Sequence, residues 1–237
     1  DEKGKGFVDS LNVVFAYAEG GTTEPELGDY QALGLSDIST APQLSLLNAL
    51  ISSYTDGSEI DTAAKLQAKA TAVNHVMLTA AVADVAGIDA AVSAGTFDDH
   101  LTTTDLAALG FNYVNTPTTA ATLVTGGAAT AEITNENIDS IRLAIANSAN
   151  DLSGVLTYSA LTSLVETTAK AANTIQAYGA ADSASAAPVP TPADYAAVGV
   201  TGVTDENVAA INSSLATDGV LDTLSSSVAA EVQDIVD

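Results

Sequence analysis

The segment Asp194-Tyr195-Ala196-Ala197-Val198-Gly199 decides the fold, because its pattern occurs three times in the chain. Each version opens with an acidic and an apolar residue and ends in glycine, which adopts a positive φ at little cost and so predicts a helix stop. We therefore expect each version to form the short first helix of a repeated unit. The other two versions are Asp29-Tyr30-Gln31-Ala32-Leu33-Gly34 and Asp105-Leu106-Ala107-Ala108-Leu109-Gly110.

A second helix is expected after each of these segments. Thr40, Thr134 and Thr204 are the expected N-caps, because a threonine hydroxyl accepts from the free N–H groups of a first helical turn. The residues that follow keep one apolar spacing, i, i+3 and i+7, which predicts one buried face per helix. These apolar positions are Leu44, Leu47 and Ile51; Ile138, Ile141 and Ile145; and Val208, Ile211 and Leu215.

A third apolar stripe at helical spacing completes each unit. Short helices with one stripe each bury those stripes only against one another, so we expect a three-helix bundle of about 45 residues. The predicted fold class is all-α, with tandem three-helix bundle modules and an irregular or small hairpin insertion in the middle module. The third-helix positions are Leu66 and Val73; Leu161, Leu164 and Val165; and Val228, Val232 and Ile235.

Composition and sequence matches predict where the modules begin and end. Residues 180–191 carry Pro188 and Pro190 among Ala and Ser, a composition typical of a semi-extended linker. Phe7-Val8-Asp9 matches Ile235-Val236-Asp237, so the N-terminal stretch is interpreted as a continued third helix. The expected divisions are 1–26, the end of a preceding module's third helix plus linker; 27–103, module 1 with linker; 104–179, module 2 with an insertion at 112–130; 180–191, the linker; and 192–237, module 3.

The charge balance excludes some partners. Thirty acidic residues against six basic ones give a formal net charge of −24, which repels nucleic acid phosphates and anionic lipid headgroups. We therefore expect no nucleic acid partner, and the sequence has no apolar run long enough for membrane insertion. The chain contains no cysteine, so disulfides, thiolate metal sites and a cysteine nucleophile are excluded.

Two acidic segments are weak candidates for a metal site. One loop alternates oxygen donors but lacks the ligand spacing of an EF-hand, and the other combines carboxylates with an imidazole, which can share a divalent ion. A weak calcium site that stiffens the loop therefore stays open beside the interpretation of these residues as turn formers and helix caps. Apart from calcium, no cofactor is expected. The candidates are Asp56, Glu59 and Asp61 in the first segment and Asp98 and Asp99, followed by His100, in the second.

No catalytic residue is expected. The sequence has no nucleotide-binding loop or zinc motif, and no hydrolase motif accompanies His75, which we expect to be a partly exposed helical residue. Small three-helix bundles also rarely contain the concave pocket that an enzyme needs.

Four tyrosines stand at matching places around the module junctions, namely Tyr17, Tyr30, Tyr178 and Tyr195. A tyrosine at an interface buries its ring while its hydroxyl stays in contact with water. We interpret these residues as packing a first helix against the linker before it, with a role as partner anchors as the alternative.

The third unit resembles the GA module, the small three-helix albumin-binding domain of bacterial surface proteins. The resemblance lies in Val198-Gly199, in the cap Thr204-Asp205-Glu206-Asn207-Val208 and in the stripe of 228–236. The chain is more closely similar to the GA-like repeats found in tandem in very large adhesins of marine and other Gram-negative bacteria. Albumin is not an expected partner, because residues 205–217 lack the aromatic side chains on which that activity of the GA module depends and carry acidic groups instead.

The resemblance implies a non-catalytic spacer segment of a secreted or cell-surface bacterial adhesin, with a host or matrix protein as a further partner. The alternative function is a self-assembling extracellular filament or surface-layer subunit. The observation behind this alternative is the match between the two chain ends. A longer array would explain the match, and so would copies that complete each other head to tail. The expected partners are thus other modules of the array or copies of the chain itself. A third interpretation makes the insertion at 112–130 a ligand-binding loop.

Overall fold

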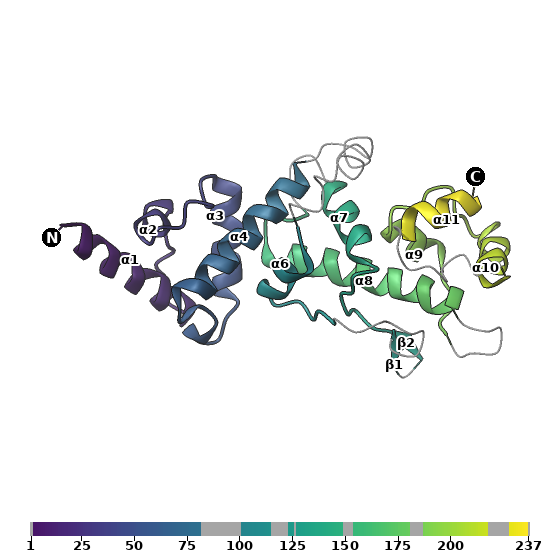
Figure 1. The fold of residues 1–237 in the computed structure, drawn as a ribbon, viewed down its shortest axis with the longest axis horizontal. Helices are drawn as coiled ribbons and strands as arrows, with labels where there is room; N and C mark the ends of the chain where they lie inside the picture. The colour runs from purple at the N-terminus through teal and green to yellow at the C-terminus, as the bar shows by residue number, and fades with distance from the viewer. Residues whose placement is uncertain are drawn as a thin grey trace. The chain divides into compact units, whose positions relative to one another are not determined.

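The computed structural model describes residues 2–81, 101–114, 123–125, 127–148, 154–180, 187–217 and 228–236, with side chains left out at 2–5, 217 and 228–231. This part of the chain is mostly helical, and its sheet content is one pair of two-residue strands (Figure 1). The predicted all-α class is therefore confirmed. None of the helices in these ranges is long and apolar enough to span a membrane.

The α-helices of the described ranges differ widely in length, from six residues to 23. In chain order they are α1 (Glu2–Ala18), α2 (Leu27–Ala32), α3 (Ala41–Ser52), the 3-10 helix η1 (Gly57–Ile60), α4 (Ala63–Ala80), α6 (Thr103–Ala108), β1 (Val124–Thr125), β2 (Ala128–Ala129), α7 (Ile138–Ala146), α8 (Tyr158–Ala180), α9 (Pro192–Ala197), α10 (Val208–Thr217) and α11 (Val228–Val236). Contacts group the chain into two compact units. Unit 1 comprises Asp1–Gly110 and Ser148–Leu161, and unit 2 comprises Phe111–Asn147 and Thr162–Asp237. The division into three modules stays a prediction.

The short helices α2, α6 and α9 begin and end in the same way. At each N-terminus, an aspartate at the third helical position accepts from the N–H of the N-cap residue, at 2.8 to 2.9 Å. These pairs are Glu26 with Asp29, Thr102 with Asp105, and Thr191 with Asp194. At each C-terminus the predicted glycine stop is confirmed, with φ of 85° at Gly34, 95° at Gly110 and 90° at Gly199.

The second helices begin in two different ways. Thr40 caps α3 as predicted, with its hydroxyl accepting from the N–H of Gln43. The helices α7 and α10 begin later than predicted, after a turn that opens at Thr134 and Thr204. In both turns an asparagine side chain accepts the threonine N–H, at 2.9 Å for Asn137 and 2.7 Å for Asn207. Gln43 accepts the N–H of Thr40 in the same way, at 2.9 Å. The hydroxyl of Thr134 also accepts from the N–H of Asn137 at 3.2 Å, so Thr134 makes the predicted capping bond.

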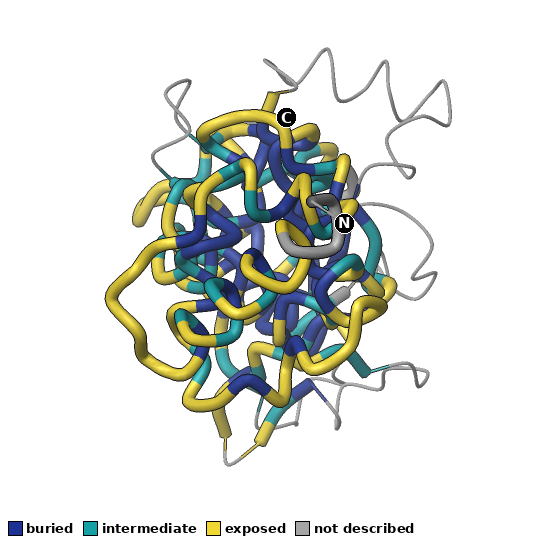
Figure 2. The backbone as a smooth tube through the Cα atoms, turned by 90° about the vertical axis from the view of Figure 1, so that its left-hand side faces the viewer, coloured by how far each residue is buried: buried dark blue, intermediate teal, exposed yellow. Residues whose placement is uncertain are grey.

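The predicted apolar faces are buried. Of the nine second-helix positions named above, all are buried except Leu44 and Val208, which are half-buried. Along the backbone, buried, half-buried and exposed stretches alternate (Figure 2). In unit 2 the core combines side chains of α8, α9, α10 and α11, including Ile175, Tyr195, Ile211 and Val232. In unit 1, α1 packs on α2 and α3, α3 packs on α4, and α4 packs on α6. Each of the short helices α2, α6 and α9 therefore packs against the long helix that precedes it.

The insertion contains a small hairpin, one of the two predicted alternatives. Strand β1 pairs with β2 in antiparallel register, with Val124 opposite Ala129, and Tyr113 forms an isolated bridge with Ile133. Residues 115–122 and 126 of the insertion lie outside the described residues.

Candidate functional site

The carboxylates of the first predicted metal loop each contact a different group. Asp56 accepts from the N–H of Ser58 at 2.8 Å, and hydrogen bonding to Ser58 holds the pKa of Asp56 below its ordinary value. Glu59 pairs with Lys69 at 3.3 Å, and Asp61 pairs with Lys65 at 2.9 Å. The loop thus uses these carboxylates as a helix cap and as partners of lysines.

The second predicted metal segment, Asp98 and Asp99 with His100, lies outside the described residues. Across the ranges that the structure describes, no group of three or more His, Asp or Glu side chains is placed to hold a metal ion. His75, the other histidine, is partly exposed and its Nδ1 lies 2.9 Å from Oδ2 of Asp105. This contact joins α4 to the capped first turn of α6, which gives His75 a structural role.

Two of the four singled-out tyrosines are fully buried and form the same contact in separate units. The hydroxyl of Tyr30 donates to Oδ1 of Asn48, and the hydroxyl of Tyr195 donates to Oδ1 of Asn212. Burial raises the pKa of both hydroxyls, and the neighbouring tyrosines Tyr17 and Tyr178 raise it further. The expected packing role of Tyr30 and Tyr195 therefore fits their contacts, but their hydroxyls are buried with asparagine instead of reaching water.

The asparagine in each contact ties a third segment into the core. The side-chain amide of Asn48 donates to the carbonyl of Pro25 at 2.8 Å, and that of Asn212 donates to the carbonyl of Pro190 at 2.9 Å. Both prolines lie just before a short helix. Neither asparagine was predicted from the sequence. The available signal was strongest at Asn212, the one buried polar residue beside the apolar positions Ile211 and Leu215 in the described part of α10, whereas α3 also buries Gln43.

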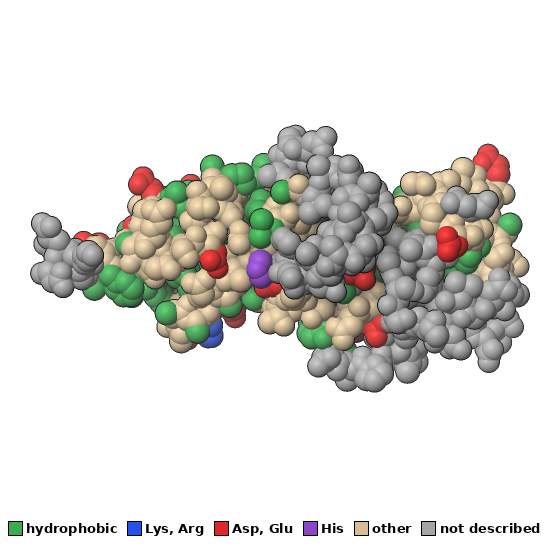
Figure 3. Space-filling view, turned by 45° about the horizontal axis from the view of Figure 1, so that its top comes forward, with side chains coloured by type: hydrophobic (Ala, Val, Ile, Leu, Met, Phe, Trp, Pro, Cys, Tyr) green, Lys and Arg blue, Asp and Glu red, His purple; other side chains and the backbone are tan. Residues whose placement is uncertain are grey.

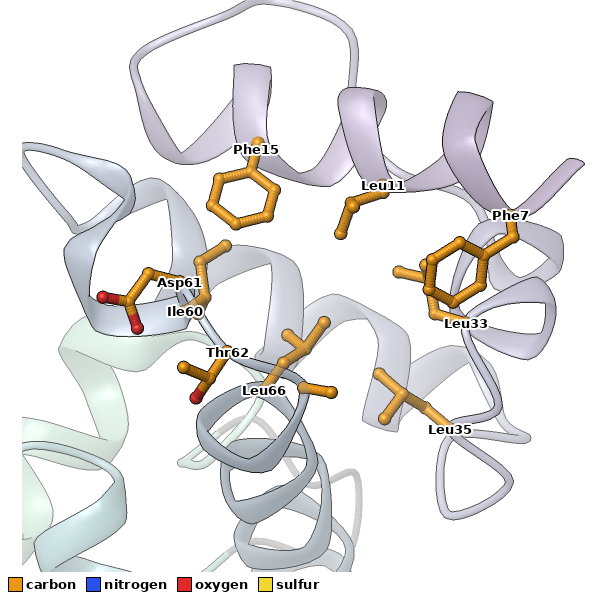
Figure 4. A pocket seen from close by; sticks show the side chains of 10 residues that line it. Phe7, Leu11, Phe15, Leu33, Leu35, Ile60, Asp61, Thr62 and Leu66 are labelled. Atoms are coloured by element: carbon orange, nitrogen blue, oxygen red, sulfur yellow. The ribbon is translucent and has the colours of Figure 1, made fainter. Parts of the chain in front are cut away.

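An apolar groove runs along α1 in unit 1. Phe7, Leu11 and Phe15 point from α1 towards Leu33, Ile60 and Leu66 (Figure 4), and the groove encloses about 160 Å³. Phe7 is 43% exposed and its neighbour Val8 is 53% exposed, so two adjacent large apolar side chains of α1 face solvent. The lining contains a single ionisable residue, Asp61, so the groove is suited to bind another apolar surface and not to acid–base chemistry.

The face of the molecule drawn in Figure 3 carries acidic side chains at several separate places and few basic ones. This agrees with the net charge of −24. Acidic groups spread in this way keep a protein soluble and attract cations diffusely.

The fold and these contacts define a mostly helical protein in which one buried Tyr–Asn contact occurs in each of two units. Comparison with protein families, curated proteins and solved structures gave no match. The repeated contact and the α1 groove are therefore the two features that bear on function.

Proposed function

We propose that the chain is a non-catalytic spacer segment of a secreted bacterial surface adhesin, built as a tandem array of GA-like three-helix modules. The observation that supports this proposal is the repeated buried contact, Tyr30–Asn48–Pro25 in unit 1 and Tyr195–Asn212–Pro190 in unit 2. The same polar contact recurs at the same place in two of the three predicted repeats, whereas the middle repeat has Leu106 where the other two have tyrosine. Recurrence of a buried contact is typical of repeated architecture.

Packing between consecutive helices also favours an array. The third helix of one predicted module packs against the first helix of the next, as α1 does on α2 and α4 does on α6. In unit 2, α8 contributes Ala171, Ala172 and Ile175 to the core of the following helices. When each repeat contacts its neighbours in this way, the array gains length by adding repeats without a change of fold. This property suits a spacer.

The spacer proposal is tested by replacing this segment in the source gene with an unrelated helical repeat of equal length. We expect adhesion of the cells to be retained, because a spacer contributes length. An antibody against the purified chain should label intact cells. Loss of adhesion in the replaced strain, at unchanged surface expression, would contradict the spacer role, and labelling of permeabilised cells alone would contradict the surface location.

A second candidate function is a self-assembling extracellular filament or surface-layer subunit, with the exposure of Phe7 and Val8 on α1 as the observation that favours it. An open apolar face on one helix supports head-to-tail contacts between copies, and such contacts build open fibres. Electron microscopy of the purified chain tests this function. Fibres that disappear on deletion of residues 1–20 are expected, and fibres that persist would contradict it.

A further inference from the structure

The short helix α6 is held at both of its ends by basic side chains of α4. At its start, Nδ1 of His75 lies 2.9 Å from Oδ2 of Asp105. At its end, Nζ of Lys69 donates to the carbonyl of Ala108 at 3.0 Å. A helix of six residues depends on such outside contacts, because it has too few internal hydrogen bonds to persist alone.

Asp105 makes two kinds of contact at the start of α6. Its Oδ2 also accepts from the N–H of Thr102 at 2.8 Å and from the hydroxyl of Thr102 at 2.7 Å, which closes the capping box of α6. The side chain of Asp105 is 11% exposed and that of His75 is 23% exposed, so water screens the contact between them only in part. A change in the charge of His75 therefore acts directly on the group that caps α6.

The residues that correspond to His75 on α1 and α8 carry no ionisable group. His75 corresponds to Val13 on α1 and to Thr174 on α8, although the same aspartate cap stands at the start of α2 and of α9. The three helices are aligned by a fully buried residue that follows this position. The aligned segments are Asn12-Val13-Val14, Asn74-His75-Val76 and Asn173-Thr174-Ile175.

The middle repeat also differs from the other two in the residue after its aspartate cap. Leu106 follows Asp105, whereas a tyrosine follows the aspartate in α2 and in α9. Leucine has no hydroxyl, so it cannot form the buried contact with asparagine that the two tyrosines form. Ionisable side chains thus hold α6 in the repeat that lacks this neutral hydrogen bond, and contacts of ionisable side chains respond to pH.

The other carboxylates around α4 have partners of their own. Helix α4 packs mainly against α3, η1 and α6, and α3 contains no ionisable residue. Asp105 is therefore the carboxylate that faces His75 within the described ranges. The remaining contacts are Glu59 with Lys69, Asp61 with Lys65, and Asp37 with Gln67 and Thr71.

We propose that the α4–α6 contact is a pH-responsive junction, in which protonation of His75 tightens the hold of α4 on α6. A protonated imidazole donates from both ring nitrogens and carries a positive charge, so it binds the Asp105 carboxylate more strongly than either neutral tautomer does. Histidine changes its charge between about pH 5 and about pH 8. Folding keeps Asp105 beside the ring, so the stability that the proton adds is present at the acidic end of this range and is lost as the pH rises. The junction gives the proposed spacer one point whose rigidity depends on pH.

Hydrogen exchange at two pH values tests the junction, with α9 as the control in the same chain. After correction for the intrinsic exchange rate, the amides of α6 should be about two- to fivefold better protected at about pH 5.5 than at about pH 7.5. The amides of α9 should not show this change, because Thr174 stands where α4 has His75. In His75→Thr, which copies α8, the change should also disappear from α6. Equal protection of α6 at the two pH values, or the same change in α9, would overturn the proposal.

NMR of the imidazole C–H signals follows the proton itself. The chain has two histidines, so every sample carries His100→Gln and the signals belong to His75 alone. We expect His75 to take up its proton at a higher pH in this chain than in the same chain with Asp105→Asn. Asparagine keeps an oxygen that accepts from Thr102 but carries no charge, so it removes the attraction and leaves the cap. Identical titrations in the two chains would show that Asp105 does not hold the proton and would overturn the junction, while the spacer proposal would stand.

Discussion

The hydroxyl of Tyr30 donates a hydrogen bond to the side-chain oxygen of Asn48, which lies 18 residues further along the chain on another helix. Tyr195 and Asn212 repeat this relationship in unit 2, at a separation of 17 residues. Each buried hydroxyl and amide is thereby satisfied, and a satisfied buried polar contact fixes one register between the helices that carry it. The contact adds specificity of packing in a chain of which only 5% of the residues are aromatic.

Removing either asparagine should destabilise the chain by a similar amount. We expect Asn48→Ala and Asn212→Ala each to lower the free energy of unfolding by about 1–3 kcal/mol, because a buried tyrosine hydroxyl and a proline carbonyl lose their partner. Urea unfolding followed by circular dichroism measures the change. Gln31→Ala, at an exposed helical position, is the control and should change stability by less than about 0.5 kcal/mol. If the asparagine variants have the same free energy of unfolding as this control, the structural role of the contact is refuted.

The two glycine stops should respond differently to alanine. Both have positive φ, 85° at Gly34 and 90° at Gly199, so alanine costs about 1 kcal/mol at either position. A Cβ at Gly34 meets no atom within 4 Å, whereas at Gly199 it would lie 2.5 Å from Cδ2 of Leu143. Gly199→Ala should therefore be the more destabilising variant in thermal unfolding. Equal effects would mean that Leu143 moves away freely.

Alkaline pH should destabilise the chain through its buried tyrosines. Burial raises the pKa of Tyr30, Tyr54 and Tyr195 above the ordinary value of 10.0. Between pH 10 and the higher folded-state pKa, the unfolded chain releases these protons while the folded chain keeps them. The stability they contribute is thus fully present below pH 10 and is lost as the pH rises further. Each tyrosine adds up to about 1.4 kcal/mol per pH unit to the loss.

The comparison of wild type with Tyr30→Phe and Tyr195→Phe isolates this effect. Each variant is less stable at neutral pH but should lose less stability between pH 9 and about pH 11 than wild type does. Urea midpoints across this range provide the measurement. Parallel pH profiles in all three proteins would show that other groups cause alkaline unfolding.

Lys69 should be far more important for stability than Lys65, although both lie on α4 and both pair with an acidic residue of the preceding loop. The side chain of Lys69 is 7% exposed, and its Nζ donates to the carbonyl of Ala108 at 3.0 Å and lies 5.0 Å from the ring centre of Tyr54. The side chain of Lys65 is 50% exposed. Lys69→Met should cost about 1–3 kcal/mol and Lys65→Met less than about 0.5 kcal/mol. A reversed order in chemical denaturation would contradict the assigned contacts.

Local patterns predicted the parts of the fold that depend on local physics. Gly34, Gly110 and Gly199 stop their helices because positive φ is a property of the residue itself, and Ile141 or Ile211 is buried because apolar periodicity follows from helix geometry. The sequence left two alternatives for the insertion, an irregular segment or a small hairpin, because turn signals do not reveal which strands pair. The start of α10 was predicted too early, because residues 205–207 form a turn after Thr204 and the helix begins only at Val208.

The contacts of the candidate site depend on residues distant in the chain, and sequence reasoning did not find them. The separation of Tyr30 from Asn48 carries no local signal, and the acidic residues Glu59 and Asp61 gave no sign that Lys69 and Lys65 would reach them. Likewise, Phe7 fits an apolar stripe in the sequence, and its exposure of 43% became visible only in the structure.

Hydrogen exchange on the intact chain tests the array claim most directly, with peptides read by mass spectrometry in wild type, Asn48→Ala and Asn212→Ala. In an array, stability is a sum of repeat and neighbour terms, so each variant should lose protection mainly in its own unit. We therefore predict faster exchange across α1 to α3 in Asn48→Ala and across α9 to α11 in Asn212→Ala. Equal loss of protection over the whole chain in both variants would mean a single cooperative core and would contradict the account.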